Sequence, residues 1–261
     1  MLEEQIRRKL RQKPLLLMTH IVIGYPSFRE SWALARGMVE AGVDLMELQI
    51  PFSEPMADGP VILAANQKAL EAGATVSKCF DFARELASQV PIPLLFMSYY
   101  NIPFKYGVRQ FAVDAKRAGV CGAIVPDLPP EEAPEYLAAM RAQDLDPVLL
   151  FAPNTPEERM RTIAAQGSGL LYCVARKGVT GQKTDFSQDL SGYLGRARRA
   201  SSLPLALGFG LKERSDVEFV RGKADVAVVG SESLRVLNES GLRATLDFIR
   251  SLTGAAPASG L

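Results

Sequence analysis

Eight short apolar runs, spread over almost the whole chain, constrain the fold of this sequence more than any other feature. The segments between several of them repeat apolar residues every three or four positions and often close with Gly, which is typical of surface helices. The sequence therefore predicts a repeated strand–helix unit. The apolar runs occupy residues 15–23, 44–50, 93–99, 122–128, 147–153, 169–175, 204–210 and 225–231.

The predicted strands are apolar along nearly their whole length, which indicates burial on both faces, as in parallel sheets covered by helices. Eight such strands joined by right-handed helical crossovers fit a closed (β/α)8 TIM barrel, an α/β fold, better than an open doubly wound sheet, the alternative. A chain of 261 residues is long enough for one such barrel, so residues 1–261 are predicted to form a single domain. Within it, residues 1–13 are expected to form an extra N-terminal helix covering the barrel bottom, and residues 254–261 a flexible tail.

Charge indicates which kinds of molecule the chain binds, and cysteine content indicates the cellular compartment. The chain has 30 basic and 29 acidic side chains, so no strong field exists to gather nucleic acid or an acidic membrane. No stretch approaches the roughly 18 apolar residues that a membrane span needs. Three widely separated cysteines, Cys79, Cys121 and Cys173, suit reduced, buried thiols. We therefore expect a cytoplasmic protein with a small-molecule substrate.

Acidic residues at strand ends are the first candidates for chemistry, because the loops at the C-terminal ends of barrel strands form the open cup. Glu47 lies in the second run, Asp58 in the loop after it, and Asp127 just past the fourth run. An ionised, unpaired carboxylate in an apolar barrel mouth costs several kcal/mol, so Glu47 is expected to have either a catalytic task or a polar partner. The partner would be Tyr99 or His20.

His20 and Glu54 are weaker candidates. A histidine exchanges protons at neutral pH, but His20 stands between apolar segments, where a buried histidine with satisfied hydrogen bonds is the more common outcome. Glu54 is predicted to be an exposed loop charge.

Late glycine-bearing turns predict a phosphate site. The turns after the seventh and eighth runs are where barrels commonly hold phosphate, because Gly lets backbone N–H groups approach and the following helix directs its positive end at the anion. The candidate ligands are Gly210, Gly230 and Ser231, with Gly181 from the long polar segment after the sixth run. That segment is expected to be a mobile lid or, alternatively, an ordinary disordered loop.

Seven segments, taken in order, resemble the tryptophan synthase alpha-subunit family over roughly residues 15–250. They are "ELQIPFSEPMADGPVI", "MSYYN", "IVPDLPPEE", "LLFAPNTPEER", "ARKGVTG", "GFG" and "VVGS". The resemblance implies a (β/α)8 barrel that cleaves indole-3-glycerol phosphate to indole and glyceraldehyde 3-phosphate. It also implies a pyridoxal-phosphate beta subunit as partner, in an alpha-beta-beta-alpha tetramer, and no cofactor in this chain.

The same resemblance assigns residues to roles. Glu47 and Asp58 match the catalytic pair, and Thr180 matches the lid threonine that meets the catalytic aspartate on closure, with Arg176 in the same lid. Gly181 matches the lid motif, and Gly210, Gly230 and Ser231 match the phosphate turns. Tyr172 matches the tyrosine that precedes the lid. The positions that line or support the indole pocket are Phe209, Ile62, Tyr99 and Met97.

The proposed chemistry agrees with these residue types. Cleavage needs C3 of the indole protonated and the side-chain hydroxyl deprotonated, and Glu47 is expected to do both. Asp58, in a wetter loop, is expected to stay ionised and accept a hydrogen bond from the indole N–H. No metal is required.

The chain departs from the family pattern at several positions near the catalytic pair. Gln49 replaces the usual Gly before "IPFS", and His20 and Val22 lie in "HIVIGYP", where the family has a run such as "YVTAGYP". Glu54 stands where Asp is usual, and Ala175 where Ser is usual. These departures leave a noncatalytic alpha-like paralogue that modulates a beta subunit as the main alternative, and another phosphate-dependent barrel lyase or isomerase as a third.

Overall fold

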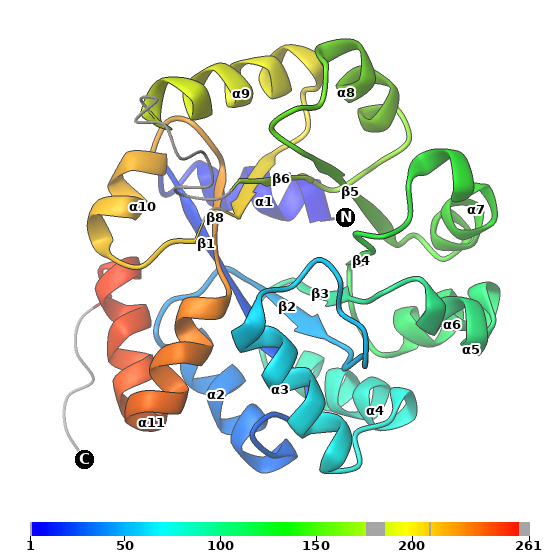
Figure 1. Cartoon of the computed structure of the whole chain (residues 1–261), viewed down its shortest axis with the longest axis vertical. Helices are drawn as coiled ribbons and strands as arrows, with labels where there is room; N and C mark the ends of the chain where they lie inside the picture. The colour runs from blue at the N-terminus through cyan, green and yellow to red at the C-terminus, as the bar shows by residue number, and fades with distance from the viewer. Residues whose placement is uncertain (1, 176–185, 209, 256–261) are drawn as a thin grey trace.

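Eight parallel strands close into one barrel in chain order in the computed structural model, which describes residues 2–175, 186–208 and 210–255 (Figure 1). Each predicted apolar run coincides with one strand to within two residues at its start, and β1 pairs with both β2 and β8, so the closed barrel is confirmed over the open sheet. The assignment of residues 1–261 to a single domain stays a prediction, supported by this one closed sheet. The strands are β1 Leu16–Val22, β2 Leu45–Gln49, β3 Leu94–Met97, β4 Gly122–Ile124, β5 Asp146–Phe151, β6 Leu171–Val174, β7 Leu205–Gly208 and β8 Val226–Val229.

Helices surround the barrel, as Figure 1 shows, and the loops after β2 and β3 each lead into a pair of them. Within the described ranges, no helix combines the length and apolar character needed to cross a bilayer. The helices are α1 Leu2–Leu10, α2 Phe28–Glu40, α3 Pro60–Glu71, α4 Val76–Ala87, α5 Asn101–Tyr106, α6 Val108–Arg117, α7 Pro134–Ala142, α8 Glu157–Ala164, α9 Phe186–Ala200, α10 Arg214–Val220 and α11 Ser231–Thr253.

Local sequence signals explain several helix boundaries. The Ser27 hydroxyl accepts a hydrogen bond from the Glu30 N–H at the start of α2, and Thr75 does the same for the Lys78 N–H at the start of α4. Gly119 follows α6 with φ +79°, and a Cβ built there would lie 2.7 Å from Cβ of Ala87. Only glycine fits that combination of conformation and close approach.

The core has two layers, because successive side chains of a strand point to opposite sides of the sheet. One layer lies between strands and helices, and the other fills the barrel. Leu45 belongs to the interior layer, so alternation also places Glu47 and Gln49 inside the barrel, toward its C-terminal mouth. Members of the interior layer include Leu16, Met18, Leu45, Leu95, Met97, Tyr99, Ile124, Val148, Ala206, Val226 and Val228.

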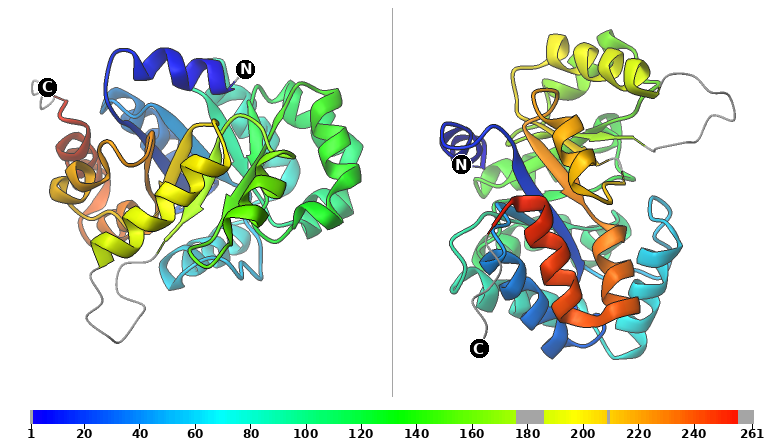
Figure 2. Two further views of the ribbon diagram at one scale, coloured as in Figure 1. Left: turned by 90° about the horizontal axis from the view of Figure 1, so that it is seen from above. Right: turned by 90° about the vertical axis from the view of Figure 1, so that its left-hand side faces the viewer.

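Helix α1 closes the bottom of the barrel. Figure 2 shows it lying across one end, and its Leu2 and Ile6 side chains are buried in the interior cluster. The Leu2 N–H also donates to Asp146 Oδ2 at 3.1 Å. The N-terminal helix is thus confirmed, although it ends at Leu10, before the predicted boundary at residue 13. The predicted tail lies outside the described residues from position 256 onward.

Cys79 and Cys173 are buried and unpaired, and burial raises the pKa of each thiol to about 12. Cys121 is half-buried and also free. Thiols held this far from their thiolate form are poor nucleophiles, so Cys79 and Cys173 act as small apolar side chains.

Candidate active site

Glu47 lies inside the barrel mouth with 3% of its surface exposed. Parallel pairing of β1 with β2 places His20 opposite Glu47, and Nδ1 of His20 lies 2.9 Å from Glu47 Oε2. The other carboxylate oxygen, Oε1, is buried and has no hydrogen-bond partner among the described residues. One oxygen of Glu47 is therefore held by the protein, and the other is left for a ligand.

Asp58 is fixed by two donors from neighbouring strands. Gln49 Nε2 donates to Asp58 Oδ2 at 2.7 Å, and the Tyr99 hydroxyl donates to the same oxygen at 2.9 Å. The Ala57 N–H donates in turn to the Tyr99 oxygen at 3.0 Å. Burial and the charge of Asp58 raise the pKa of Tyr99, which keeps the phenol protonated as a donor. Neither bond uses Asp58 Oδ1.

The charges of the two acids also act on His20. Burial alone would lower its pKa, but the hydrogen bond and negative charge of Glu47, together with the charge of Asp58, outweigh burial and raise the pKa above 6.5. His20 is therefore the buried partner of Glu47, one of the two partners expected from the sequence. The other, Tyr99, binds Asp58 instead.

Tyr172 on β6 faces the same acids. Burial, the negative charges of Glu47 and Asp58, and the interaction of the phenol O–H with the Glu47 carboxylate raise the pKa of Tyr172 well above its usual value. A Cβ built on Gly208 would lie 2.8 Å from the Tyr172 hydroxyl oxygen, so glycine at the end of β7 leaves room for the phenol. Tyr172 therefore presents a neutral O–H beside Glu47.

The turn after β8 reaches the same mouth. A Cβ built on Gly230 would lie 3.8 Å from Cβ of His20 and 4.0 Å from Cδ1 of Ile62. Gly230 caps α11, which begins at Ser231. The positive end of this helix and its leading N–H groups thus lie near the candidate acids, the arrangement that favours an anion.

Gly210 corrects one detail of the sequence interpretation. The sequence predicts glycine here for the close approach of a ligand, and no described atom lies within 4 Å of a Cβ built there. Gly210 instead has φ +78°, a conformation that a β-branched residue strongly disfavours. Glycine is needed there for its backbone conformation.

The structure brings most of the predicted residues together at the mouth, and four of them lie outside the described residues. Glu47, Asp58, Tyr172, Tyr99, Ile62, Gly230 and Ser231 meet at the mouth, and Met97 is buried on β3 beside them. Asp127, the third acidic candidate, accepts the Tyr100 N–H through both oxygens at the start of α5, which is a structural role. Glu54 is exposed as predicted. Arg176, Thr180, Gly181 and Phe209 lie outside the described residues.

Sequence reasoning missed the part played by Gln49 and Asn66. The signal for Gln49 was available, because it stands two residues after Glu47 and shares its side of the strand. Asn66 is fully buried on α3 and joins the network by donating to Gln49 Oε1 at 3.3 Å. Its role depends on how α3 packs against β2, which no local pattern reveals.

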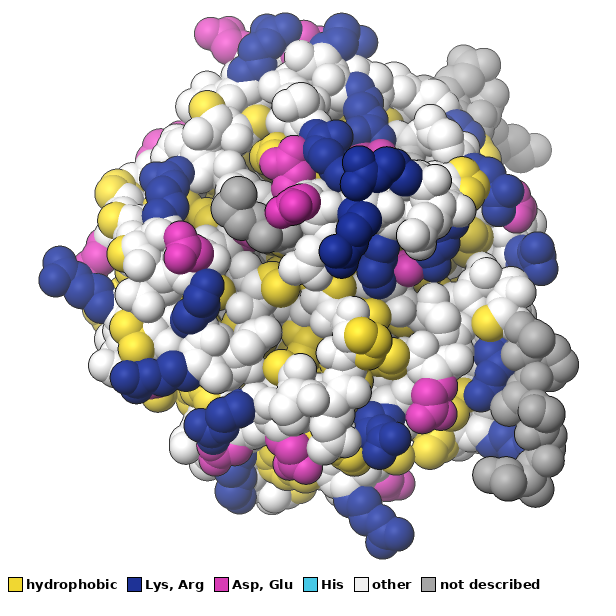
Figure 3. Space-filling view, turned by 180° about the vertical axis from the view of Figure 1, so that it is seen from behind, with side chains coloured by type: hydrophobic (Ala, Val, Ile, Leu, Met, Phe, Trp, Pro, Cys, Tyr) yellow, Lys and Arg dark blue, Asp and Glu magenta, His cyan; other side chains and the backbone are white. Residues whose placement is uncertain are grey.

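Basic side chains gather at the opposite end of the molecule. Figure 3, the reverse of the view in Figure 1, shows Lys and Arg side chains concentrated on this face, and α1 carries Arg7, Arg8 and Lys9 in its last turn. These charges lie away from the mouth, so they do not form the predicted phosphate site.

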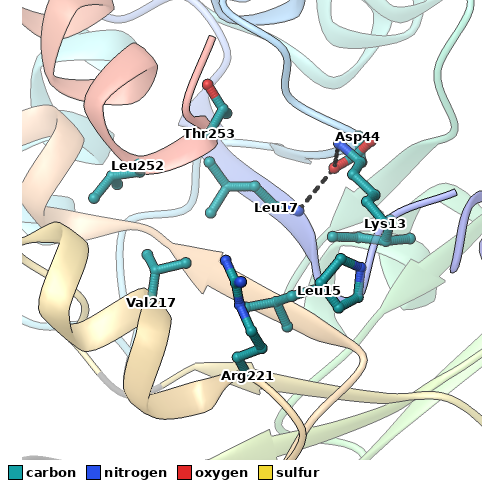
Figure 4. Close-up of a pocket in the computed structure, with 10 residues that line it drawn as sticks. Lys13, Leu15, Leu17, Asp44, Val217, Arg221, Leu252 and Thr253 are labelled. Carbon is teal, nitrogen blue, oxygen red and sulfur yellow. Dashed lines mark hydrogen bonds and ion pairs between the residues drawn. The ribbon is translucent and has the colours of Figure 1, made fainter.

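A pocket also lies at that end (Figure 4), between the start of β1 and the ends of α10 and α11. Its acidic residue, Asp44, is already engaged, accepting the Leu17 N–H at 2.9 Å and pairing with Lys13 Nζ at 2.6 Å. The described residues contain no group of three or more His, Cys, Asp or Glu side chains placed to hold a metal ion. Candidate chemistry is therefore centred on Glu47 and Asp58.

Comparison with known proteins agrees with this arrangement. The family model described as tryptophan synthase alpha chain matches residues 6–253. Tryptophan synthase alpha chains of Syntrophotalea carbinolica and Desulforapulum autotrophicum are 63% and 59% identical to this chain, each alignment covering 97% of this chain and 100% of the relative.

Solved structures give the same result. Tryptophan synthase of Mycobacterium tuberculosis superposes with a TM-score of 0.89 at 31% identity, covering 97% of this chain and 96% of the other. The alpha subunit from Legionella pneumophila superposes with a TM-score of 0.88 at 29% identity, covering 97% of both chains. The matched family model, the identity of the relatives and the barrel with its two acids together show that the chain belongs to the tryptophan synthase alpha chain family.

Proposed function

We propose that this chain is a carbon–carbon lyase that cleaves indole-3-glycerol phosphate to indole and glyceraldehyde 3-phosphate. The observation that carries the proposal is the buried Glu47, whose Oε1 has no partner among the described residues while Oε2 is held by His20. An unpaired buried carboxylate oxygen is costly, and a substrate with a proton to exchange offsets that cost.

Glu47 carries a proton in both directions. Its carboxyl donates a proton to C3 of the indole, and positive charge spreads onto the ring nitrogen. The carboxylate then takes the proton of the hydroxyl on the carbon attached to C3. The bond between that carbon and C3 breaks, its electron pair returns to the ring, and indole and an aldehyde are formed.

Asp58 stabilises the charge that develops between these steps. Gln49 and Tyr99 hold its Oδ2 and orient the carboxylate. A carboxylate held in advance beside the indole N–H stabilises the cationic ring more than the neutral one, so it lowers the barrier.

The phosphate of the substrate is placed at the turns after β7 and β8. Gly210, Gly230 and Ser231 supply backbone N–H groups and the positive end of α11, and Gly181 joins them from the lid. Ile62, Met97, Tyr99, Tyr172 and Phe209 line or support the indole pocket in this proposal, and Arg176 and Thr180 belong to the lid.

A pyridoxal-phosphate beta subunit is the proposed partner, in an alpha-beta-beta-alpha tetramer formed in the cytoplasm, and the alpha chain itself uses no cofactor. Exposed apolar side chains support a contact surface near the mouth: Met56 after β2 is 80% exposed, Phe104 on α5 59% and Leu63 on α3 49%. Exposed large apolar side chains favour a protein contact.

The test is cleavage of indole-3-glycerol phosphate by the purified chain, followed as release of glyceraldehyde 3-phosphate with and without a tryptophan synthase beta subunit. We expect cleavage that rises when the beta subunit is added. Absence of cleavage under both conditions would reject the lyase in favour of the noncatalytic paralogue, and cleavage of other phosphorylated substrates alone would favour a different barrel enzyme.

A further inference from the structure

A continuous line of hydrogen bonds joins the two candidate acids. Glu47 Oε2 lies 2.9 Å from His20 Nδ1, and His20 Nε2 lies 2.9 Å from Gln49 Oε1. Gln49 Nε2 then donates to Asp58 Oδ2 at 2.7 Å. His20 and Gln49 are therefore placed between the acids, on β1 and β2, within the barrel mouth.

The backbone fixes the direction of these bonds. The Phe52 N–H donates to Asn66 Oδ1 at 2.9 Å, and Asn66 Nδ2 donates to the Ile62 carbonyl at 2.9 Å, so the Asn66 amide has one orientation. Asn66 Nδ2 also donates to Gln49, which must present its oxygen there and its nitrogen to the Asp58 carboxylate. A reversed Gln49 would face a donor with a donor and an acceptor with an acceptor.

This orientation decides which ring nitrogen of His20 carries a proton. Gln49 Oε1 is only an acceptor, so Nε2 of His20 must be protonated. The opposite nitrogen, Nδ1, faces a carboxylate oxygen, and whenever Glu47 is ionised this nitrogen must be protonated as well. With Glu47 ionised, the network therefore requires an imidazolium.

The charges around His20 favour the same state. The titratable groups that face it are Glu47 from β2 and Asp58 from the following loop, both negative when ionised, with the neutral phenol of Tyr172 beside Glu47 on the β6 side. Their attraction and the bond to Glu47 raise the pKa of His20 despite its burial.

We propose that His20 is a positioning residue that, locked by Gln49 as an imidazolium, holds Oε2 of Glu47 and leaves Oε1 to carry out both proton transfers. This inference rests on the proposed function. The proton that Oε1 gives to C3 is replaced by the hydroxyl proton, while His20 keeps both ring protons throughout. Between the two transfers, the charged Nδ1–H stabilises the carboxylate that must act as base.

The first measurement needs no substrate, because His20 is the single histidine of the chain. Nitrogen-15 NMR of tag-free protein with labelled histidine reports one imidazole directly. We expect both ring nitrogens to be protonated at pH 7, with titration above 6.5. In Gln49→Leu, Nε2 of His20 has no acceptor, so we expect the imidazolium to lose a proton at a lower pH than in the wild-type protein. A neutral ring at pH 7 in the wild-type protein would overturn the inference.

The second measurement is kinetic and uses His20→Asn, which keeps a neutral donor within reach of Glu47 but has no titratable ring. We expect kcat to fall about 10–100-fold, the usual scale for losing a group that orients a reacting residue, with little change in KM. The limb of the kcat–pH profile that belongs to His20 should disappear.

The matched control is Thr19→Val, on the same strand but on its opposite face. Thr19 is buried and its hydroxyl has no partner among the described residues, so the isosteric change should leave kcat and the pH profile unaltered. A wild-type protein that cleaves substrate, with a pH profile retained in His20→Asn, overturns only the role of His20. A wild-type protein without cleavage overturns the proposed function and this role with it.

Discussion

At the scale of single residues, Glu47 is the side chain on which the proposed reaction depends most. Glu47→Gln keeps the size of the side chain and a hydrogen bond to His20, but an amide does not donate and retrieve a proton as a carboxyl does. We expect kcat to fall by about 10²–10⁴-fold, the range for a positioned acid–base group. Steady-state kinetics measures this loss, and calorimetry with glycerol 3-phosphate should show retained binding. Full activity in this variant would remove Glu47 from the mechanism.

His20 should also make stability depend on pH. Its pKa is raised in the folded protein, so the folded state binds the proton more tightly than the unfolded state does. The resulting stabilisation is fully present below the unfolded pKa of about 6.5 and is lost as pH rises through the folded pKa.

The difference in unfolding free energy between the wild-type protein and His20→Asn should therefore shrink as pH rises above 6.5. Urea unfolding of both proteins between pH 6 and pH 9 measures it. A difference that grows over this range would mean that His20 is neutral in the folded protein.

The sequence predicted Glu47 and Asp58 but not the way they are connected. Alternation along β2 places Glu47 inside the barrel, and this can be predicted from the sequence of one strand alone. The contact with His20 depends on the register between β1 and β2, and the role of Gln49 depends on Asn66 in a later helix. The sequence alone shows Gln49 and His20 only as departures from the family pattern, because their mutual hydrogen bond depends on how β1 and β2 pair.

At the scale of elements, the turn after β7 should be sensitive to its backbone conformation. Gly210→Val places a β-branched residue at φ +78°. We expect affinity for glycerol 3-phosphate to fall about 10–100-fold, equivalent to about 1–3 kcal/mol of backbone strain. Calorimetry measures this, with Gly210→Asn as the control, because Asn tolerates positive φ better and should bind more tightly than the Val variant. Equal affinity in the wild-type protein and the Val variant would exclude this turn from the site.

Helix α1 should contribute to stability without contributing to chemistry. Ile6 is buried against the barrel interior, so Ile6→Ala is expected to reduce the unfolding free energy by about 2–5 kcal/mol, as for other large-to-small core changes. Arg8→Ala, exposed on the same helix, should change it by less than about 0.5 kcal/mol. Urea unfolding compares the two, and similar values would show that α1 is only loosely attached.

At the scale of the whole molecule, the eight strands were predicted better than the number and bounds of the helices. Eight apolar runs are enough to predict eight strands, because short, nearly continuous apolar runs are typical of parallel strands that are buried on both faces. The eight runs do not reveal that two helices follow β2 and two follow β3, because each pair is joined by a short turn rather than by a strand. The end of α1 was misplaced because the basic residues after Leu10 continue a helical composition.

The proposed contact with a beta subunit also concerns the whole molecule, and it can be tested at the exposed side chain of Met56. Met56→Asp introduces a charge on a side chain that is 80% exposed near the mouth. Because desolvating an unpaired charge opposes association, we expect about tenfold or weaker binding to the beta subunit, with basal cleavage preserved. Titration calorimetry measures the affinity, and Arg8→Ala at the opposite end is the control. Unchanged affinity for the Asp variant would place the contact elsewhere.

Because α1 closes the lower end of the barrel, it determines where substrate and products can enter and leave. Leu2 and Ile6 fill the lower end of the barrel, so substrate and products are expected to enter and leave through the mouth. A partner subunit docked over the barrel mouth would therefore receive a released product before that product reaches the surrounding water.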